Sequence, residues 1–215
     1  MAIRVLLADD HPIFRAGLRS LLETEPAVKI LAEVADGLAA VEAARTKKPD
    51  LVVIDVSMPG MNGLEARRRI TAEAPGVKVL CLSMHSDRRF VDAALRSGAH
   101  GYLLKECALQ ELVNAIHAVL AGQIYMSPGL GAAVLADYRA EGHEHSAIHR
   151  LTSREREVLQ LLSEGHSARS IAARLDLSVK TVGTHREHLR QKLGTHSLAG
   201  LTKLAIREGL TSTEE

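Results

Sequence analysis

Tryptophan is absent from this sequence, and only 2% of its residues are aromatic. Proteins that bind single-stranded nucleic acid without sequence preference stack the bases on aromatic side chains, so this class is disfavoured. The two cysteines, Cys81 and Cys107, have no CxxC spacing, and we expect both to be free thiols in a reducing cytoplasm. Disulfide scaffolds and cysteine-based metal centres are disfavoured for the same reason.

Long hydrophobic runs and a strong charge of one sign are also missing. No run approaches the ~18 apolar residues that a membrane helix needs, and the N-terminus lacks the profile of a signal peptide. We therefore expect a cytoplasmic protein with no membrane partner. Lys and Arg match Asp and Glu at 15 to 15 in residues 1–120 but outnumber them by 11 to 8 in residues 150–215. This basic C-terminal third points to an anionic partner such as nucleic acid.

Residues 1–120 show a regular alternation of two patterns. Apolar runs that are typical of parallel strands cover residues 3–8, 28–34, 51–54, 77–82 and 99–104. Segments with a helical period follow these runs, at residues 12–24, 37–47, 63–73, 87–97 and 108–121. Five right-handed βα units predict an α/β domain with a doubly wound five-stranded parallel sheet.

Polar residues stand where these strands end. They are Asp9 and Asp10 after the first strand, Asp55 after the third, Ser83 after the fourth and Lys105 after the fifth. The carboxyl ends of parallel strands share one edge of a sheet, so we expect these side chains to lie together. Carboxylates this close repel each other by about 1–4 kcal/mol per pair, and a cation relieves that repulsion. Mg²⁺, or Mn²⁺ in its place, suits such a site because it binds carboxylate and phosphate oxygens.

This set of residues predicts a phosphoryl acceptor. Asp55 would attack a phosphorus atom and form an acyl phosphate, while Lys105 and the cation offset the added charge and Ser83 bonds a phosphoryl oxygen. A Mg-dependent phosphohydrolase would use the same carboxylate as its nucleophile. Such an enzyme would carry a second Asp two residues after Asp55, and Ser57 stands there instead.

The motifs LLADDHP, LVVIDVSMPGMNGLE, LCLSMH and GYLLKE resemble those of the receiver domain of two-component response regulators. The resemblance covers residues 1–121 and implies a flavodoxin-like fold in which a sensor histidine kinase phosphorylates Asp55. For the metal, the resemblance implies Asp10 as a direct Mg²⁺ ligand, the backbone carbonyl of Ser57 as the third protein ligand, and Asp9 as a ligand through water. For the switch, it implies a hydroxyl at Ser83, the receiver lysine at Lys105, and an aromatic residue, Tyr102, that turns inward on phosphorylation. Receivers often carry proline after the lysine, whereas this chain has Glu106, which leaves the geometry of that loop open.

Residues 122–148 break the alternation with glycine, serine and proline, and we interpret them as a linker. His143 and His145 lie in this linker, and His149 follows it directly. Three histidines at this spacing suit a transition metal, but a solvated linker is the favoured interpretation because no cysteine or second cluster accompanies them.

The C-terminal segment has helical patterns throughout. Thr152 with Glu155 forms a capping box before its first helix, and Ser167 and Ser178 can cap the second and third. An apolar stripe on the third helix consists of Val182, Leu189 and Leu193. Two short helices joined by a tight turn, the second of them basic, predict a helix-turn-helix. A small helical bundle that binds protein fits this spacing equally well.

The string LTSREREVLQLLSEGHSARSIAARLDLSVKTVGTHREHLRQKLG strongly resembles the DNA-binding domain shared by LuxR-type and NarL/FixJ-type regulators. The resemblance covers residues 149–210, leaves 211–215 as a tail, and implies a smaller all-α helix-turn-helix domain. Its third helix would enter the major groove of double-stranded DNA. Its fourth would pair with a second copy through the stripe Leu198, Leu201 and Ala205, although core packing explains this stripe equally well.

One face of the third helix is expected to read DNA. A turn of 100° per residue places Gly183, where relatives usually carry Lys, on the same outward face as Glu187. The residues expected to contact DNA are Lys180, Thr181, Gly183, Thr184, Arg186, Glu187, His188, Arg190, Gln191 and Lys192. Of these, the four basic residues would anchor phosphates.

The two resemblances together predict a DNA-binding transcriptional response regulator. Phosphorylation of Asp55 would promote a homodimer that binds DNA with two half-sites. We expect no enzyme activity beyond slow self-catalysed phosphoryl transfer and hydrolysis at Asp55. The alternative is an adaptor, also controlled by phosphorylation, that binds a protein and not DNA.

Overall fold

The computed structural model describes residues 2–86, 88–128, 130, 147–195 and 197–211. The chain forms two compact units, Met1–Glu141 and Gly142–Glu215. The domain boundaries at residues 121 and 149 remain predictions. His143, His145 and the side chain of His149 lie outside the described residues, so the linker interpretation of these histidines remains a prediction as well.

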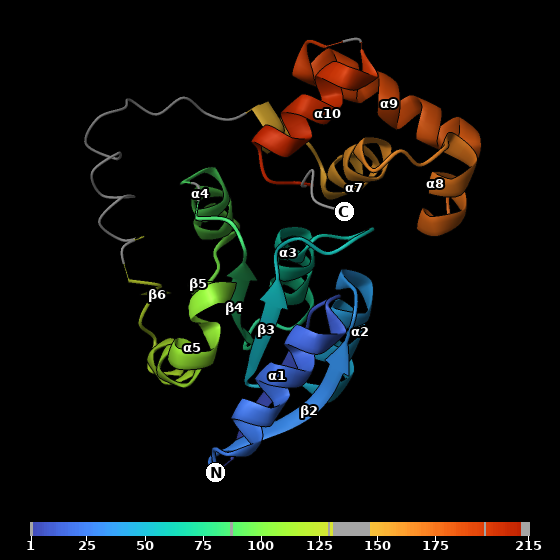
Figure 1. The fold of residues 1–215 in the computed structure, drawn as a ribbon. Coiled ribbons are helices and arrows are strands. Elements are labelled where there is room, and N and C mark those ends of the chain that lie inside the picture. The colour runs from blue at the N-terminus through green and yellow to red at the C-terminus, as the bar shows by residue number, and fades with distance from the viewer. Residues whose placement is uncertain (1, 87, 129, 131–146, 196, 212–215) are drawn as a thin grey trace. The chain divides into compact units, whose positions relative to one another are not determined.

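A parallel sheet forms the centre of the first unit, in the strand order β2-β1-β3-β4-β5-β6 (Figure 1). Its strands are β1 Ile3–Ala8, β2 Val28–Val34, β3 Leu51–Asp55, β4 Lys78–Ser83, β5 Gly101–Leu104 and β6 Tyr125–Met126. Among the described residues, the helices of this unit are α1 Pro12–Glu23, α2 Gly37–Lys47, α3 Gly63–Glu73, α4 Arg88–Ser97 and α5 Lys105–Leu120. The predicted doubly wound fold is confirmed, and all five predicted strands are present.

The sheet has one strand more than the sequence predicts. The additional strand, β6, pairs in parallel with β5 and lies in the predicted linker. Its two residues are too few to show any period. The Ser127 hydroxyl, directly after β6, accepts a hydrogen bond from the backbone N–H of Leu104 (3.0 Å). The beginning of the predicted linker is therefore attached to the end of β5.

Hydrophobic side chains cover both faces of the sheet. Val52 and Ile54 of β3 pack in one cluster with residues of α2, α3 and α4. Leu51 and Val53 pack in a second cluster with residues of α1 and α5. Every residue of β3 is buried, which explains why this apolar run lacks alternation. The carboxyl end of β3 is thereby fixed at the centre of the sheet edge.

Two helices begin close to that edge. The helix α5 begins at Lys105 and not at residue 108, because β5 leads into it without an intervening turn. The helix α3 begins at Gly63, where a Cβ atom would lie 2.0 Å from the carbonyl oxygen of Asp55. Only glycine permits this close approach of the helix to β3.

The second unit is helical. Its elements are a 3₁₀ turn, η1 Ala147–Arg150, and the helices α7 Ser153–Ser163, α8 Ala168–Leu175, α9 Val179–Leu193 and α10 Leu198–Arg207. Both hydrogen bonds of the predicted capping box at Thr152 and Glu155 are present (2.8 and 3.2 Å). Ser167 and Ser178 cap α8 and α9 as predicted.

A single hydrophobic cluster holds these helices together. Val182 and Leu189 are fully buried in it and Leu193 is partly buried, so the predicted stripe of α9 faces the core. Asp176 adopts a left-handed conformation (φ 52°) in the tight turn between α8 and α9. Across the described parts of both units, none of the helices is long and apolar enough to cross a membrane.

Candidate functional site

Three carboxylates meet at the carboxyl edge of the sheet. Asp9 and Asp10 follow β1, and Asp55 ends β3. One oxygen of each carboxylate and a ring nitrogen of His11 lie within 4.8 Å of one another. Asp9 and Asp55 are buried, whereas the Asp10 side chain is 28% exposed. The structure thus brings together the three acids that the sequence places at the strand ends.

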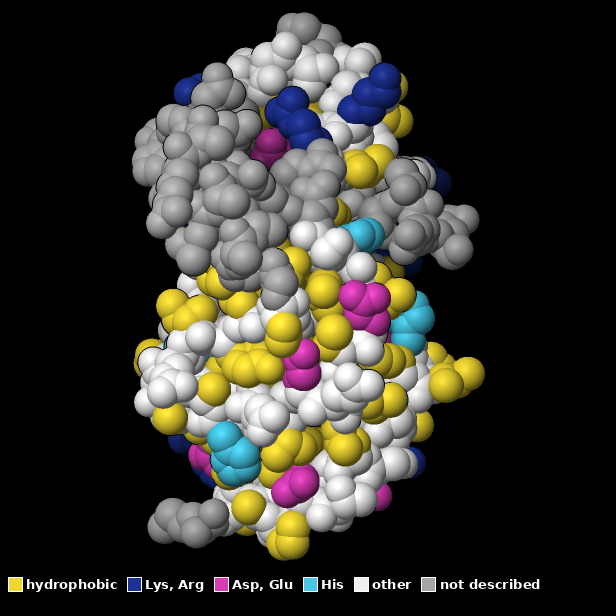
Figure 2. Space-filling view, turned by 60° about the vertical axis from the view of Figure 1, so that its left-hand side comes forward, with side chains coloured by type: hydrophobic (Ala, Val, Ile, Leu, Met, Phe, Trp, Pro, Cys, Tyr) yellow, Lys and Arg dark blue, Asp and Glu magenta, His cyan; other side chains and the backbone are white. Residues whose placement is uncertain are grey.

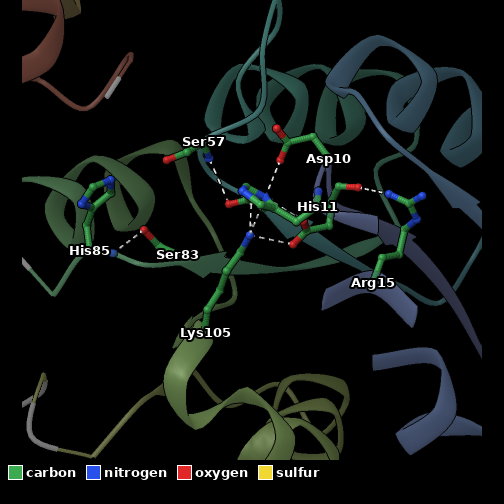
Figure 3. A network of polar contacts seen from close by, with 9 residues as sticks. Asp10, His11, Arg15, Ser57, Ser83, His85 and Lys105 are labelled. Atoms are coloured by element: carbon green, nitrogen blue, oxygen red, sulfur yellow. Dashed lines mark hydrogen bonds and ion pairs between the residues drawn. The ribbon is translucent and has the colours of Figure 1, made fainter. Parts of the chain in front are cut away.

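Lys105 reaches this cluster from the first turn of α5 (Figure 3). Its Nζ lies 2.6 Å from Asp55 Oδ2 and 2.8 Å from Asp9 Oδ2. Burial by itself lowers the pKa of Lys105, but the carboxylates of Asp55 and Asp9 outweigh burial and the pKa is raised overall. Lys105 therefore remains a cation between two acids.

Asp55 is held in an unfavourable environment for its own charge. Burial raises the pKa of Asp55, and repulsion from Asp9 acts in the same direction. The charge of Lys105 and the hydrogen bond from the backbone N–H of Ser57 to Asp55 Oδ1 (3.1 Å) favour the ionised form, but the net shift is upward. A further cation near Asp55 would relieve this cost.

His11 also belongs to the cluster, and the sequence reasoning missed it. Its Nδ1 lies 2.9 Å from Asp10 Oδ1, 3.3 Å from Asp9 Oδ1 and 3.8 Å from Asp55 Oδ2. Its backbone N–H donates to Asp9 Oδ1 (2.8 Å), which orients that carboxylate. The available signal was its position directly after Asp9 and Asp10, in the loop that leaves the end of β1.

The residues predicted to act as a switch lie on β4 and β5. Ser83 ends β4, and its Oγ accepts a hydrogen bond from the backbone N–H of His85 (3.0 Å). The Tyr102 hydroxyl donates a hydrogen bond to the backbone carbonyl of His85 (2.7 Å). The Tyr102 ring is fully buried in this structure, and its inward turn on phosphorylation remains a prediction. The Lys105–Glu106 peptide bond, which the sequence left open, is trans.

The oxygen donors of this site fit a hard divalent cation. Mg²⁺ takes carboxylate oxygens and keeps several waters, and the three acids surround one point at the rim of the sheet. Asp10 Oδ1 is buried and makes no hydrogen bond. Its close contact is the His11 ring nitrogen at 2.9 Å, which a cation at this oxygen would have to displace. A nucleophilic carboxylate, a neighbouring ammonium group and a place for a cation are what phosphoryl transfer requires.

In the second unit, the predicted reading face of α9 is exposed to solvent. Gly183, Thr184, Glu187, His188 and Gln191 are all exposed. Two of the four basic residues expected to anchor phosphates have acidic partners within the unit. Arg190 Nη1 lies 3.5 Å from Glu187 Oε2, and Lys192 Nζ lies 2.7 Å from Glu155 Oε2.

Comparison with protein families assigns both units. Residues 5–117 match the family described as response regulator receiver domain. Residues 149–205 match the family described as bacterial regulatory proteins, luxR family. The chain belongs to the NarL/FixJ-type response regulators. It is a response regulator with a LuxR-type DNA-binding domain.

Individual relatives support this assignment, two of them over nearly the whole chain and one over two thirds of it. The chain is 37% identical to the response regulator UvrY of Escherichia coli (strain K12) over 212 residues, which cover 99% of this chain and 97% of UvrY. A LuxR-family response regulator from Aurantimonas sp. SI85-9A1 is 40% identical, with a TM-score of 0.62 over 66% of this chain and all of that one. RcsB from Salmonella enterica serovar Typhimurium, solved bound to the promoter rprA with a phosphomimetic, is 26% identical, with a TM-score of 0.63 over 95% of this chain and 98% of that one.

The structure corrects one expectation about the LuxR-type domain. Leu201 and Ala205 of α10 are 3% and 0% exposed and pack in the domain core. They cannot contact a second copy as placed, so the core-packing interpretation of this stripe holds for both. Only Leu198, which is 51% exposed, remains as a surface residue of the predicted set. Periodicity shows which side of a helix is apolar but not what covers that side.

Proposed function

We propose that this response regulator accepts a phosphoryl group on Asp55 from a sensor histidine kinase, and that phosphorylation promotes a dimer that binds double-stranded DNA. One observation carries the proposal. Lys105 Nζ lies 2.6 Å from Asp55 Oδ2 inside a cluster of three acids at the end of the central strand. The kinase domains of sensor histidine kinases and the DNA both lie in the cytoplasm, so we propose that the protein is cytoplasmic.

Phosphoryl transfer uses one oxygen of Asp55 as the nucleophile. That oxygen bonds to phosphorus while the bond from phosphorus to the donor nitrogen breaks, and an acyl phosphate results. Lys105 offsets the negative charge that develops, and the Ser57 backbone N–H orients the carboxylate through Oδ1 (3.1 Å). The protein supplies positioning and charge and turns over no separate substrate, so slow transfer and hydrolysis at Asp55 are its only expected chemistry.

The carboxylates around Asp55 would hold Mg²⁺, with Mn²⁺ as a substitute. Asp10, Asp55 and the backbone carbonyl of Ser57 are the proposed ligands, and Asp9 acts through water. The cation supplies positive charge to the phosphoryl oxygens when it is bound.

A hydrogen-bond path supports a switch that leads away from Asp55. Ser83 would turn toward Asp55 and donate its hydroxyl to a phosphoryl oxygen, and in turning it would give up the hydrogen bond that its Oγ accepts from the His85 N–H. The His85 carbonyl accepts the Tyr102 hydroxyl (2.7 Å), so movement at His85 would reach β5 and its neighbour α5. Figure 2 shows that the side of the receiver unit bearing α5 and β6 carries many hydrophobic and few basic side chains. We propose that this side takes part in dimerisation.

Chemical phosphorylation tests the acceptor directly. With acetyl phosphate and Mg²⁺, the intact protein should gain the mass of one phosphoryl group that is stable in acid and labile in base. Asp55→Asn should abolish the gain, because an amide is no nucleophile for phosphorus. Asp50→Asn is the matched control, since Asp50 is a partly exposed carboxylate directly before β3, at the opposite end of that strand. Phosphorylation that persists in Asp55→Asn would contradict the assignment.

A further inference from the structure

A second group of metal-ligating side chains lies in the LuxR-type domain. Glu155 of α7 and His185 and His188 of α9 each place one ligand atom within 4.8 Å of the other two. His188 Nδ1 is 3.6 Å from Glu155 Oε1. The Glu155 side chain is 3% exposed, whereas that of His188 is 49% exposed. The group therefore has a buried floor and an open side.

We propose that Glu155, His185 and His188 form a binding site for a transition metal ion such as Zn²⁺. Two histidines three residues apart lie on the same side of a helix, and a carboxylate from a second helix completes three ligands, with solvent left for a fourth position. Ligands around tetrahedral Zn²⁺ lie about 3.4 Å apart, given bonds of about 2.0–2.1 Å. The pair of His188 and Glu155 is already close to this spacing, and small side-chain rotations would bring in His185.

His185 provides an independent reason to expect a ligand here. Its Nδ1 is buried and makes no hydrogen bond. A buried polar atom without a partner costs free energy, and a metal bound at Nδ1 would satisfy it. A group of histidine and glutamate side chains exposed on the surface would not contain such a buried, unpaired nitrogen atom.

The chemistry of the donors selects the type of metal. Two imidazole nitrogens and one carboxylate suit Zn²⁺, Cu²⁺ or Ni²⁺, whereas Mg²⁺ and Ca²⁺ prefer oxygen donors. Lys192 competes for the same acid, because its Nζ lies 2.9 and 2.7 Å from the two Glu155 oxygens. Binding of a dication therefore requires the ammonium group to withdraw, and Lys192 weakens the site.

This proposal does not depend on phosphorylation or on DNA binding. An occupied site would, however, tie His188 to α7 and add positive charge beside the exposed face of α9. Metal binding is therefore measured without DNA, so that its failure is distinct from a failure of the proposed function.

Calorimetric titration of the full chain with Zn²⁺ tests the site. The protein is first freed of metal with a chelator and kept in excess Mg²⁺, which would compete with Zn²⁺ for the receiver carboxylates. The background variant carries Asn at His143, His145 and His149, so that these histidines cannot contribute. We expect one equivalent of Zn²⁺ to bind in this background. No binding there would overturn the proposal.

Two substitutions in that background identify the ligands. His188→Ala should weaken Zn²⁺ binding at least about tenfold, because even the loss of an outer partner costs about 10–100-fold. The control His117→Ala, at an exposed position of α5, should change nothing. Lys192→Gln should tighten binding, because it removes the ammonium group that competes for Glu155. Unchanged affinity in His188→Ala, or unchanged or weaker binding in Lys192→Gln, would overturn the assignment.

Discussion

At the scale of single residues, Asp55 combines a buried position with a negative charge. Its carboxylate has Lys105 as a partner, but burial and Asp9 together keep the pKa of Asp55 above its usual value. The ionised group is therefore less stable in the folded chain than in the unfolded chain at neutral pH. The acceptor site is maintained at the expense of stability, as is common for functional sites.

Asp55→Asn should therefore stabilise the receiver unit at neutral pH. Two carboxylates about 4 Å apart repel by about 1–4 kcal/mol, and the lost attraction to Lys105 reduces the net gain to on the order of 1 kcal/mol. A raised pKa in the folded state means that the gain is absent below about pH 4, where Asp is protonated in the unfolded chain too. The gain should grow as pH rises through the folded pKa of Asp55. Urea unfolding followed by circular dichroism at acid and neutral pH measures it.

Asp50→Asn should destabilise the receiver unit at neutral pH, and it serves as the control. The hydrogen bond and charge of Arg4 lower the pKa of Asp50, so ionised Asp50 stabilises the fold above its unfolded pKa. A wild type that is more stable than Asp55→Asn at neutral pH would contradict our account of the acceptor site.

Glu187 is a second acid whose environment predicts a measurable effect. It lies on the exposed face of α9, and its Oε2 is 3.5 Å from Arg190 Nη1. Glu187→Ala should tighten binding to all DNA sequences and steepen the salt dependence by about one unit of slope, because Arg190 is then available to a phosphate. Gly183→Lys should add a similar contact, since open space surrounds Gly183. Binding-site selection at fixed salt measures the base preference of both variants, and titration of one duplex at several salt concentrations measures the slope.

A different result for Glu187→Ala would change its role. Relaxed preference at one base position, by about 1–3 kcal/mol, would mean that Glu187 accepts a hydrogen bond from a cytosine amino group. No effect of either substitution on affinity or preference would show that α9 is not the reading helix.

At the scale of elements, α7 shows how a helix start supports the second unit. Thr152 and Glu155 exchange two hydrogen bonds at its N-terminus, and Glu155 also binds Lys192 of α9. The capping box therefore begins α7 and also joins it to α9. This arrangement lowers the pKa of Glu155 against the opposing effect of its burial, so its stabilising contribution is lost as pH falls through that lowered value.

Thr152→Ala should destabilise the helical unit by about 1 kcal/mol, within the range of about 0.5–2 kcal/mol seen for lost N-caps. Ser153→Ala, at the adjacent exposed position, should cost less than about 0.5 kcal/mol. Chemical unfolding of the full chain, followed by circular dichroism, distinguishes the two. Equal effects of the two substitutions would show that the cap contributes nothing specific.

The elements also show which parts of the fold can be predicted from the apolar period of the sequence. The five long strands and their helices were predictable, because each has enough residues for its apolar pattern to be recognised. The strand β6 has two residues and no pattern, and its pairing depends on β5 as a partner. The early start of α5 was missed because Leu104 ends the strand and also stands at the N-cap of the helix.

At the scale of the whole molecule, the meeting of Asp9, Asp55 and Lys105 was predictable because parallel strands end at one edge. His11 had only its position after Asp9 and Asp10 as a sequence signal, and His85 had none, because the roles of both depend on backbone hydrogen bonds within loops. The stripe of α10 was ambiguous because the same pattern serves a core and an interface. The ion pair between Lys192 and Glu155 could not be predicted from the local sequence, because it depends on the packing of α9 against α7.

The central claim is that phosphorylation of Asp55 controls DNA binding, and affinity for duplex DNA tests it most directly. A duplex obtained by binding-site selection is titrated at fixed salt with the wild type and with Asp55→Asn, each with and without acetyl phosphate and Mg²⁺. We predict that phosphorylation tightens wild-type binding about 5- to 150-fold, the usual range for coupling between two sites, and doubles the mass in sedimentation. Asp55→Asn should not respond. Equal affinity with and without the phosphoryl group would contradict the account, and failure to bind duplex DNA even at low salt would favour a protein-binding adaptor.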